Sequence, residues 1–161
     1  MASAVAAAVT DGAQVAAGGY APAELAAQAG YCRPTVVTGL RSTHALVRHE
    51  LFGPVTAVLR ADDEDEALRL ANATEYGLAA SVFTRDLGRA LHFSRALKAG
   101  VAFVNAATVE AETHLPFGGM GASGNGSRDT GLPTLETYTE WKTTYLAPAG
   151  TEPASCEPLP P

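Results

Sequence analysis

Residues 55–104 decide the fold of this chain, and they read VTAVLRADDEDEALRLANATEYGLAASVFTRDLGRALHFSRALKAGVAFV. Three short apolar segments, 55–59, 79–84 and 101–104, are separated by two longer segments with the spacing of helices. Strands that are too apolar to alternate cleanly are buried on both faces, as in a parallel sheet covered by helices. The pattern therefore predicts an α/β fold with an open, mostly parallel sheet and helices on both faces.

The first predicted helix begins in an acidic run, residues 62–66. Asp62 or Asp63 can cap it, and Glu64 to Glu66 then lie in its first turn, where the helix dipole favours anions. Tyr76–Gly77 is expected to end it. A metal site is the alternative for this run, but the spacing and central glycine of a calcium loop are missing. We therefore interpret the run as a capped, solvated helix start.

The second predicted helix is capped by Asp86 and ends at Gly100. Its inward residues are expected to be Leu87, Ala90, Leu91 and Leu97. In sheets of this kind, catalytic and ligand groups lie at the carboxyl ends of the strands. The loop after Val104 is therefore the predicted location of functional side chains.

The segments on the N-terminal side of this unit are shorter. Residues 1–11 are predicted to form a helix that ends at Asp11–Gly12. Two strands are expected, at 14–17 and at 34–38. Between them, residues 18–30 are rich in Gly, Ala and Pro and are predicted to form a loop that can hold one helical turn.

The C-terminal side is less regular. Residues 105–131 are glycine-rich and loop-like, and residues 135–146 are rich in the aromatic and β-branched residues that favour strands. The last residues, 147–161, are rich in Pro, Ala and Glu and are expected to be disordered. We thus expect three parts: an N-terminal helix and loop (1–33), a main folded region (34–146) and this tail.

The composition excludes several classes of protein. The chain has 161 residues, 47% of them hydrophobic, which suits one globular domain. Its net charge of -6 argues against nucleic acid or an anionic membrane as the main partner. No apolar run approaches the roughly 20 residues that span a bilayer, and the alanine-rich start lacks the basic region of a signal peptide. Two cysteines and four histidines without ligand spacing predict no metal site and a reducing, cytoplasmic location.

Two further features could carry chemistry. Residues 119–124 match the G-x-G-x-x-G pattern, but a dinucleotide loop needs a strand just before it and a helix just after it. Neither is expected here, so a flexible turn that folds over a neighbouring site is favoured. Cys32 has no base or helix start nearby in the sequence, so a small core cysteine is favoured over a nucleophile.

Six segments resemble the aldehyde dehydrogenase family in order and spacing. They are ELFGPV (50–55), ANATEYGL (71–78), VFTRD (82–86), GVAFVN (100–105), LPFGG followed by Ser123–Gly124 (115–124) and YTEWKT (138–143). The resemblance covers about residues 30–146, and we expect it to include the N-terminal helix. It implies the C-terminal part of such an enzyme, with a portion of the catalytic domain and an oligomerisation strand.

The resemblance also implies roles. Family members oxidise an aldehyde to an acid with NAD or NADP, through a catalytic cysteine. Glu50 would accept hydrogen bonds from the nicotinamide ribose, and Phe52 would contact the nicotinamide side of the cofactor. Asn105 and Phe117 would border the aldehyde pocket. Residues 138–146 would pair with another subunit, in a homo-oligomer or with a related dehydrogenase.

Departures from the family pattern are equally informative. The family's cysteine segment, its water-activating glutamate and its main phosphate-binding elements precede everything matched here, and neither Cys32 nor Cys156 aligns with the nucleophile. Many members carry a lysine where this chain has Gly121. We therefore expect no turnover by this chain alone and assign it no catalytic residue. The alternatives are a non-catalytic module that joins dehydrogenase subunits, or a truncated remnant.

Overall fold

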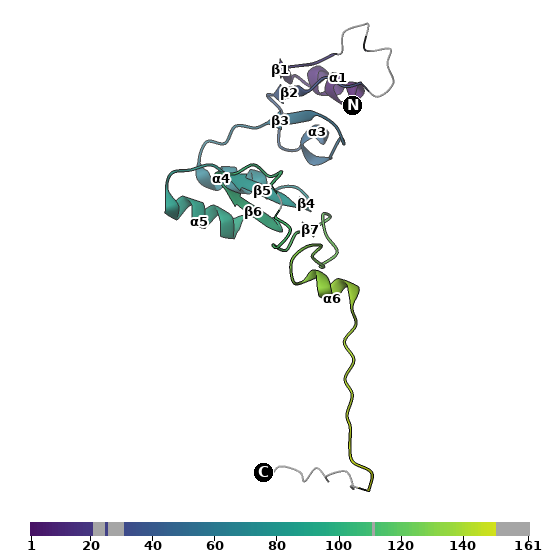
Figure 1. Ribbon diagram of the computed structural model, residues 1–161. Helices are drawn as coiled ribbons and strands as arrows, with labels where there is room; N and C mark the ends of the chain where they lie inside the picture. The colour runs from purple at the N-terminus through teal and green to yellow at the C-terminus, as the bar shows by residue number, and fades with distance from the viewer. Residues whose placement is uncertain (21–24, 26–30, 111, 151–161) are drawn as a thin grey trace, which may run out of the picture.

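The computed structural model of the chain describes residues 1–20, 25, 31–110 and 112–150. The elements are α1 (Ala2–Thr10), β1 (Gln14–Ala17), β2 (Thr35–Thr38), α3 (Ala45–Arg48), β3 (Val55–Val58), α4 (Glu64–Ala71), β4 (Tyr76–Gly77), β5 (Ala79–Val82), α5 (Leu87–Ala96), β6 (Val101–Val104), β7 (Met120–Gly121) and α6 (Thr134–Tyr138). Figure 1 shows an elongated molecule, with α1 to β3 at one end, α4 to β6 in the middle and an extended segment after α6.

The strands form three small sheets. β2 pairs in parallel with β3 and antiparallel with β1, β5 pairs in parallel with β6, and β4 pairs antiparallel with β7. The α/β character and the parallel pairing are confirmed. The expected single sheet is divided, because β3 and β5 are not hydrogen-bonded to each other within the described residues. β1 pairs with β2, so the N-terminal segment shares a sheet with the main region.

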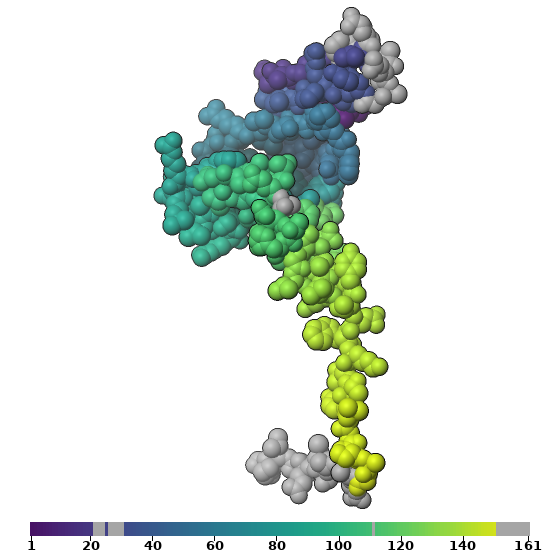
Figure 2. Space-filling view, in the orientation of Figure 1, coloured from purple at the N-terminus to yellow at the C-terminus, as the bar shows by residue number. Residues whose placement is uncertain are grey.

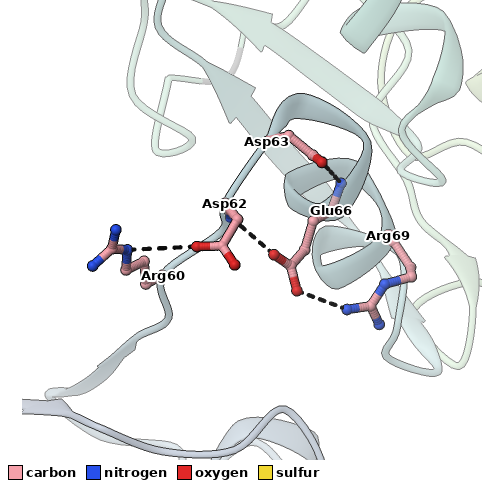
Figure 3. Close-up of polar contacts among 5 residues, drawn as sticks. All are labelled: Arg60, Asp62, Asp63, Glu66 and Arg69. Carbon is pink, nitrogen blue, oxygen red and sulfur yellow. Dashed lines mark hydrogen bonds and ion pairs between the residues drawn. The ribbon is translucent and has the colours of Figure 1, made fainter.

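The start of α4 is capped as the acidic run predicts (Figure 3). The Asp63 carboxylate accepts a hydrogen bond from the Glu66 N–H at 2.7 Å, and the Glu66 carboxylate accepts one from the Asp62 N–H at 2.8 Å. The arrangement resembles a capping box, except that Glu66 bonds to the residue before the N-cap and not to the N-cap itself. Glu66 also pairs with Arg69 at 3.2 Å, and Asp62 with Arg60 at 3.7 Å. These carboxylates are used in the helix start, and the described residues contain no cluster suited to a metal ion.

Helices α4 and α5 lie side by side beside β5 and β6 (Figure 1). Near their N-terminal ends, Arg89 pairs with Glu64 at 2.8 Å. At their C-terminal ends, the side chain of Asn72 donates to the Ala96 carbonyl at 2.9 Å and accepts from the Lys98 N–H at 2.7 Å. The two helices are therefore joined at both ends by side-chain contacts.

Two expectations for these helices are wrong. α4 ends at Ala71, with Asn72 as its C-terminal cap. The helix stops there because the side-chain amide of Asn72 is hydrogen-bonded to the backbone of the segment that connects α5 to β6. The predicted stop, Tyr76–Gly77, is instead strand β4. In α5, Leu87 and Leu91 are exposed and only Ala90 is fully buried. No described segment covers the side of the helix that carries the two leucines.

The buried core is small and lies at the N-terminal end. It consists of Ala8, Ala13, Val37 and Leu46, with four partly buried residues packed against it: Leu40, Leu51, Val55 and Ala57. The whole chain exposes 12366 Å² of surface, whereas a compact protein of 16.5 kDa exposes about 7,600 Å². No described helix is long and apolar enough to cross a membrane.

The region after the glycine-rich loop differs from the expected strand. Residues 134–138 form helix α6, so the β-like expectation is wrong for Leu135–Tyr138. The turn is closed by local bonds, in which the N–H groups of Leu135 and Glu136 donate to Leu132 and Pro133. Residues 139–146 follow without a strand partner and extend away from the body (Figure 2). Most of the expected disordered tail, residues 151–161, lies outside the described residues, as does most of the predicted loop at 18–30.

Candidate functional site

A cleft of about 660 Å³ lies between the N-terminal sheet and the β5–β6 unit. One side is formed by α3, the turn that follows it and β3. The other side is formed by the C-terminal ends of α4 and α5, by β4 and by the start of β5. Glu50 and Phe52 both line this cleft, so the structure brings the two predicted cofactor residues together.

The turn that carries Glu50 and Phe52 is held at its start by α3. The ring of His44 caps α3 by accepting the Leu46 N–H at 3.0 Å, and its other nitrogen lies 3.2 Å from the Asp11 carboxylate. α3 then ends at Arg48, and the chain enters residues 49–53. The position of the turn therefore depends on a contact between α3 and the end of α1.

Phe52 has an unusual conformation. Its φ is +50°, in the left-handed region that a bulky residue rarely adopts, and the residue is 88% exposed. A conformation of this kind costs about 1–3 kcal/mol unless the surroundings compensate for it. Burial of the ring does not compensate here. Gly53 follows, with the side chain of Met1 where a β-carbon would lie.

Asn105 follows β6 directly and also has a positive φ, of +55°. Its side chain is bonded in both directions to the backbone of Thr84, at the end of β5. Its own N–H donates to the Val82 carbonyl at 2.8 Å. Asn105 thus joins the ends of the two strands where the chain enters the glycine-rich loop. It does not line the cleft that holds Glu50 and Phe52.

Phe117 is half-buried in the glycine-rich loop. Its carbonyl accepts the Asp129 N–H at 2.7 Å, and the Thr113 carbonyl accepts the Gly131 N–H at 3.2 Å. The Thr130 hydroxyl donates to the Leu115 carbonyl. The two ends of the loop therefore lie side by side, and they consist of residues 113–117 and 129–131. Phe117, like Asn105, lies outside the lining of the cleft.

The G-x-G-x-x-G segment is not a dinucleotide loop. Its residues 120–121 form β7, which pairs with β4, and no helix follows it directly. The Ser123 hydroxyl accepts the Gly77 N–H at 3.2 Å, and the Ala122 N–H donates to the Glu75 carbonyl at 2.9 Å. The expected flexible turn is thus a turn fixed against β4. A β-carbon at Gly119 or Gly124 would collide with backbone in this turn.

Cys32 is half-buried and does not belong to the cleft. It lines a smaller cavity of about 200 Å³ with Tyr20, Tyr31 and Arg33. No described side chain places a base beside its sulfur. Cys156 lies outside the described residues.

Two polar residues that contact the cleft were not predicted as site residues. Asn72 and Ser123 both line it. Each is also hydrogen-bonded through its side chain to a distant backbone group, Asn72 to the Ala96 carbonyl and Ser123 to the Gly77 N–H. A signal for Asn72 was present, since an asparagine just after a helix often caps it. Its partners, Ala96 and Lys98, are more than twenty residues away and could not be inferred from local sequence.

The chain resembles known proteins over nearly all of its described length. The model of the aldehyde dehydrogenase family matches residues 1–144. Betaine aldehyde dehydrogenase of Rhizobium leguminosarum bv. trifolii (strain WSM2304) is 43% identical over 136 residues, which are 84% of this chain and 28% of that protein. The NADP/NAD-dependent aldehyde dehydrogenase PuuC of Escherichia coli (strain K12) is 47% identical over 114 residues, 71% of this chain and 23% of PuuC.

Solved structures of aldehyde dehydrogenases also match this chain. The indole-3-acetaldehyde dehydrogenase of P. syringae, in complex with NAD⁺, matches with a TM-score of 0.81 at 41% identity, over 89% of this chain and 28% of that one. A salicylaldehyde dehydrogenase from Pseudomonas putida G7, in complex with salicylaldehyde, matches with a TM-score of 0.83 at 32% identity, over 94% of this chain and 30% of that one. The chain thus spans less than a third of the length of the relatives it matches.

Proposed function

The chain belongs to the aldehyde dehydrogenase family, and we propose that its 161 residues form the C-terminal part of an NAD- or NADP-dependent enzyme that oxidises an aldehyde to a carboxylic acid. The observation that carries this proposal is the pair Glu50 and Phe52 on one turn of the cleft. An aromatic ring that is 88% exposed, on a left-handed residue, has no stabilising role in the described fold. A bound ligand would give it one.

The two side chains fit the two parts of such a cofactor. The Glu50 carboxylate is exposed in the cleft and can accept hydrogen bonds from two neighbouring ribose hydroxyls. The Phe52 ring offers an apolar face for the nicotinamide side. When bound, the cofactor supplies the hydride acceptor. The role of this turn is then to hold the cofactor in one orientation.

Asn105 and Phe117 are proposed to border the aldehyde pocket. Phe117 would present an apolar wall that excludes water while the acyl intermediate forms. Asn105 would act mainly through the backbone that it holds, because its amide is occupied by Thr84. Both residues lie outside the cofactor cleft, so this pocket needs a further surface to close it.

We propose that these 161 residues alone do not catalyse the oxidation of an aldehyde. Aldehyde oxidation by this family's chemistry needs a thiolate nucleophile activated near the cofactor. Cys32 lies in a different cavity from Glu50 and Phe52. The nucleophile would come from polypeptide outside these 161 residues.

A chimera tests the proposal. The 114-residue region of PuuC that matches this chain is replaced by the matching residues of this chain. We expect aldehyde-dependent formation of NADH or NADPH, and Glu50→Gln should raise the KM for the cofactor at least about tenfold. Asp65→Asn removes an exposed carboxylate on α4 and serves as the matched control. A folded chimera without activity, or an equal effect of both substitutions, would contradict the assignment.

A second candidate function is supported by the segment after α6. Residues 139–146 are extended and exposed, and Trp141, Tyr145 and Leu146 are each at least 90% exposed. An exposed, extended apolar segment of this kind is suited to pairing with a sheet of another subunit. We propose that it joins this chain to another dehydrogenase subunit. Light scattering on the chain, with and without residues 139–161, tests this, and a monomer in both cases would count against it.

A further inference from the structure

The ring of His44 is hydrogen-bonded through both of its nitrogens. Its Nδ1 accepts the N–H of Leu46 at 3.0 Å, and its Nε2 lies 3.2 Å from a carboxylate oxygen of Asp11. A backbone N–H can only donate and an ionised carboxylate can only accept, so Nδ1 carries no proton and Nε2 carries one. The two partners therefore assign one form of the ring, the neutral tautomer with its proton on Nε2.

This ring joins two elements that are far apart in the sequence. His44 is the N-terminal cap of α3, whereas Asp11 is the C-terminal cap of α1. The side chain of His44 is 15% exposed, so the ring lies between the two helix ends and not in solvent. α3 has only four residues, and a helix of one turn is marginal without a side-chain cap. The presence of α3 therefore depends on the acceptor that the ring provides.

Helix α3 in turn fixes one end of the cofactor turn, which we define as residues 49–53. The His49 N–H donates to the Ala45 carbonyl at 2.9 Å, and Glu50 follows directly. Phe52 has its left-handed φ within this turn, and a strained residue keeps its conformation only where the surrounding structure holds it. The far end is held by the Met1 side chain, which lies against Gly53, and by the pairing of β3 with β2. At the near end the support is α3.

A second proton on the ring would remove that support. It can bind only at Nδ1, which then becomes a donor that faces the donor N–H of Leu46. The contact with Asp11 would persist, because a carboxylate also accepts from a positively charged ring. The cap of α3 is therefore the interaction that protonation breaks, and the ring stays with α1.

The charged groups around the ring do not reverse this effect. The elements that pack against α3 are α1, β2 and β3, and none of them contains a charged side chain within its bounds. The remaining titratable groups of its own segment and of the start of α1 are Arg41, Arg48, His49, Glu50 and the α-amino group of Met1. The four side chains are exposed, so solvent screens their charges, and Met1 lies at the opposite end of α1 from Asp11.

We propose that His44 is a positioning residue for the cofactor turn, and that it holds the turn only while its ring is neutral. Uptake of one proton by the ring releases α3, and the strained turn relaxes. Affinity for the cofactor then falls as the pH is lowered from about 8 to about 5, the range in which histidine side chains change charge. The inference rests on the proposed roles of Glu50 and Phe52 in binding the cofactor, but release of the turn is observable without any cofactor.

Nuclear magnetic resonance of the 161-residue chain tests the structural step. The nitrogen shifts of the His44 ring report which nitrogen carries the proton, and we expect the proton on Nε2 at about pH 8. As the pH is lowered, the amide signals of Leu46 and Phe52 should move with the same midpoint as the ring. The amide of Gly150, far from α3 in the sequence, is the control and should not follow that midpoint.

Two asparagine variants separate this ring from the neighbouring histidine. Asparagine keeps a side-chain oxygen that caps helices and does not titrate, so His44→Asn should keep the cofactor turn and abolish the response of Leu46 and Phe52 to pH. His49→Asn removes the exposed ring beside Glu50 and should leave the response in place. His44→Leu has no acceptor, so already at about pH 8 its Phe52 signal should lie where that of the wild type lies at about pH 5.

A longer chimera measures the consequence for the cofactor. It carries residues 1–144 of this chain, the span that the family model matches, in place of the corresponding part of PuuC. The same chimera with His44→Asn is the reference for every other effect of pH. Between about pH 8 and about pH 6, the KM for NAD or NADP should rise at least about threefold more in the chimera than in this reference, within the range expected for loss of a helix cap. The ratio of their kcat values should stay constant.

Failure of this inference is distinguishable from failure of the proposed function. A His44 ring with its proton on Nδ1, or Leu46 and Phe52 signals that ignore the ring, would overturn the positioning role whatever the chimera does. Equal pH profiles of KM with and without His44→Asn would also overturn it, provided that Glu50→Gln raises the KM. Signals that follow the ring, combined with no effect of Glu50→Gln, would support release of the turn and overturn its role in binding the cofactor.

Discussion

The side-chain amide of Asn105 is bonded to the backbone of Thr84 in both directions. Its Nδ2 donates to the Thr84 carbonyl at 2.9 Å, and its Oδ1 accepts the Thr84 N–H at 2.8 Å. An amide is the side chain that can match a backbone peptide group with one donor and one acceptor. The pair fixes the end of β5 to the end of β6.

Asn105→Asp should destabilise the chain by about 1–2 kcal/mol, because the donor is lost and a carboxylate then faces the Thr84 carbonyl. The midpoint of urea unfolding measures this effect. Asn125→Asp is the control, since Asn125 is bonded to Ser127 only through its oxygen, which aspartate keeps. Equal midpoints for Asn105→Asp and the wild type would contradict the importance of the pair.

Gly100→Ala should lower stability by about 1–3 kcal/mol. A β-carbon there would collide with the backbone carbonyl of Gly118, so the glycine-rich loop would have to move away from β6. Gly88→Ala is the contrasting variant, because Gly88 lies in α5, where alanine favours the helix, and its β-carbon would meet a side-chain oxygen of Asp86 at 3.1 Å and no backbone atom. In thermal unfolding, Gly100→Ala should lower the Tm, and Gly88→Ala should not lower it.

Phe52→Asn should separate stability from cofactor binding. Asparagine tolerates a left-handed backbone better than phenylalanine, so the free energy of unfolding should not decrease. In the chimera, the same change should raise the KM for NAD or NADP at least about fivefold, because the apolar contact is lost. A destabilised variant with normal cofactor kinetics would give Phe52 a structural role instead.

Proline at two neighbouring positions of β3 should have unequal effects on the stability of the isolated chain. The N–H of Thr56 points toward β2, so Thr56→Pro should destabilise the 161-residue chain itself by roughly 2–3 kcal/mol. Ala57→Pro removes an N–H at the free edge, so the isolated chain should unfold almost as the wild type does. Identical behaviour of both variants in the isolated chain would show that the edge is not free.

Most of the local structure could be predicted because it depends on neighbouring residues. The bounds of β1 and β6 and the cap of α5 by Asp86 follow from short-range patterns, and the acidic run narrows the cap of α4 to Asp62 or Asp63, of which Asp63 is the cap. The helix at Thr134–Tyr138 was missed because its threonines and tyrosine favour strands, whereas bonds within the turn close it.

The arrangement of those elements was less predictable. The division into three sheets depends on which strands meet, and apolar content does not specify that. For the site, the resemblance singled out Glu50 and Phe52, and the structure places both in one cleft. The contributions of Asn72 and Ser123 depend on partners 24 to 46 positions away, and local spacing gave no sign of them.

Glu50 and Asn105 lie next to strands of different sheets, which has a consequence for evolution and engineering. The turn with Glu50 leads into β3, whereas Asn105 ends β6, and no described strand is common to both sheets. Under the roles proposed for these residues, a small slip of one sheet against the other would misalign the cofactor turn and the aldehyde pocket, and a shift of about 1 Å can cost about 100-fold in rate. Adaptive mutations could therefore accumulate at the seam between the sheets, remote from every reacting atom.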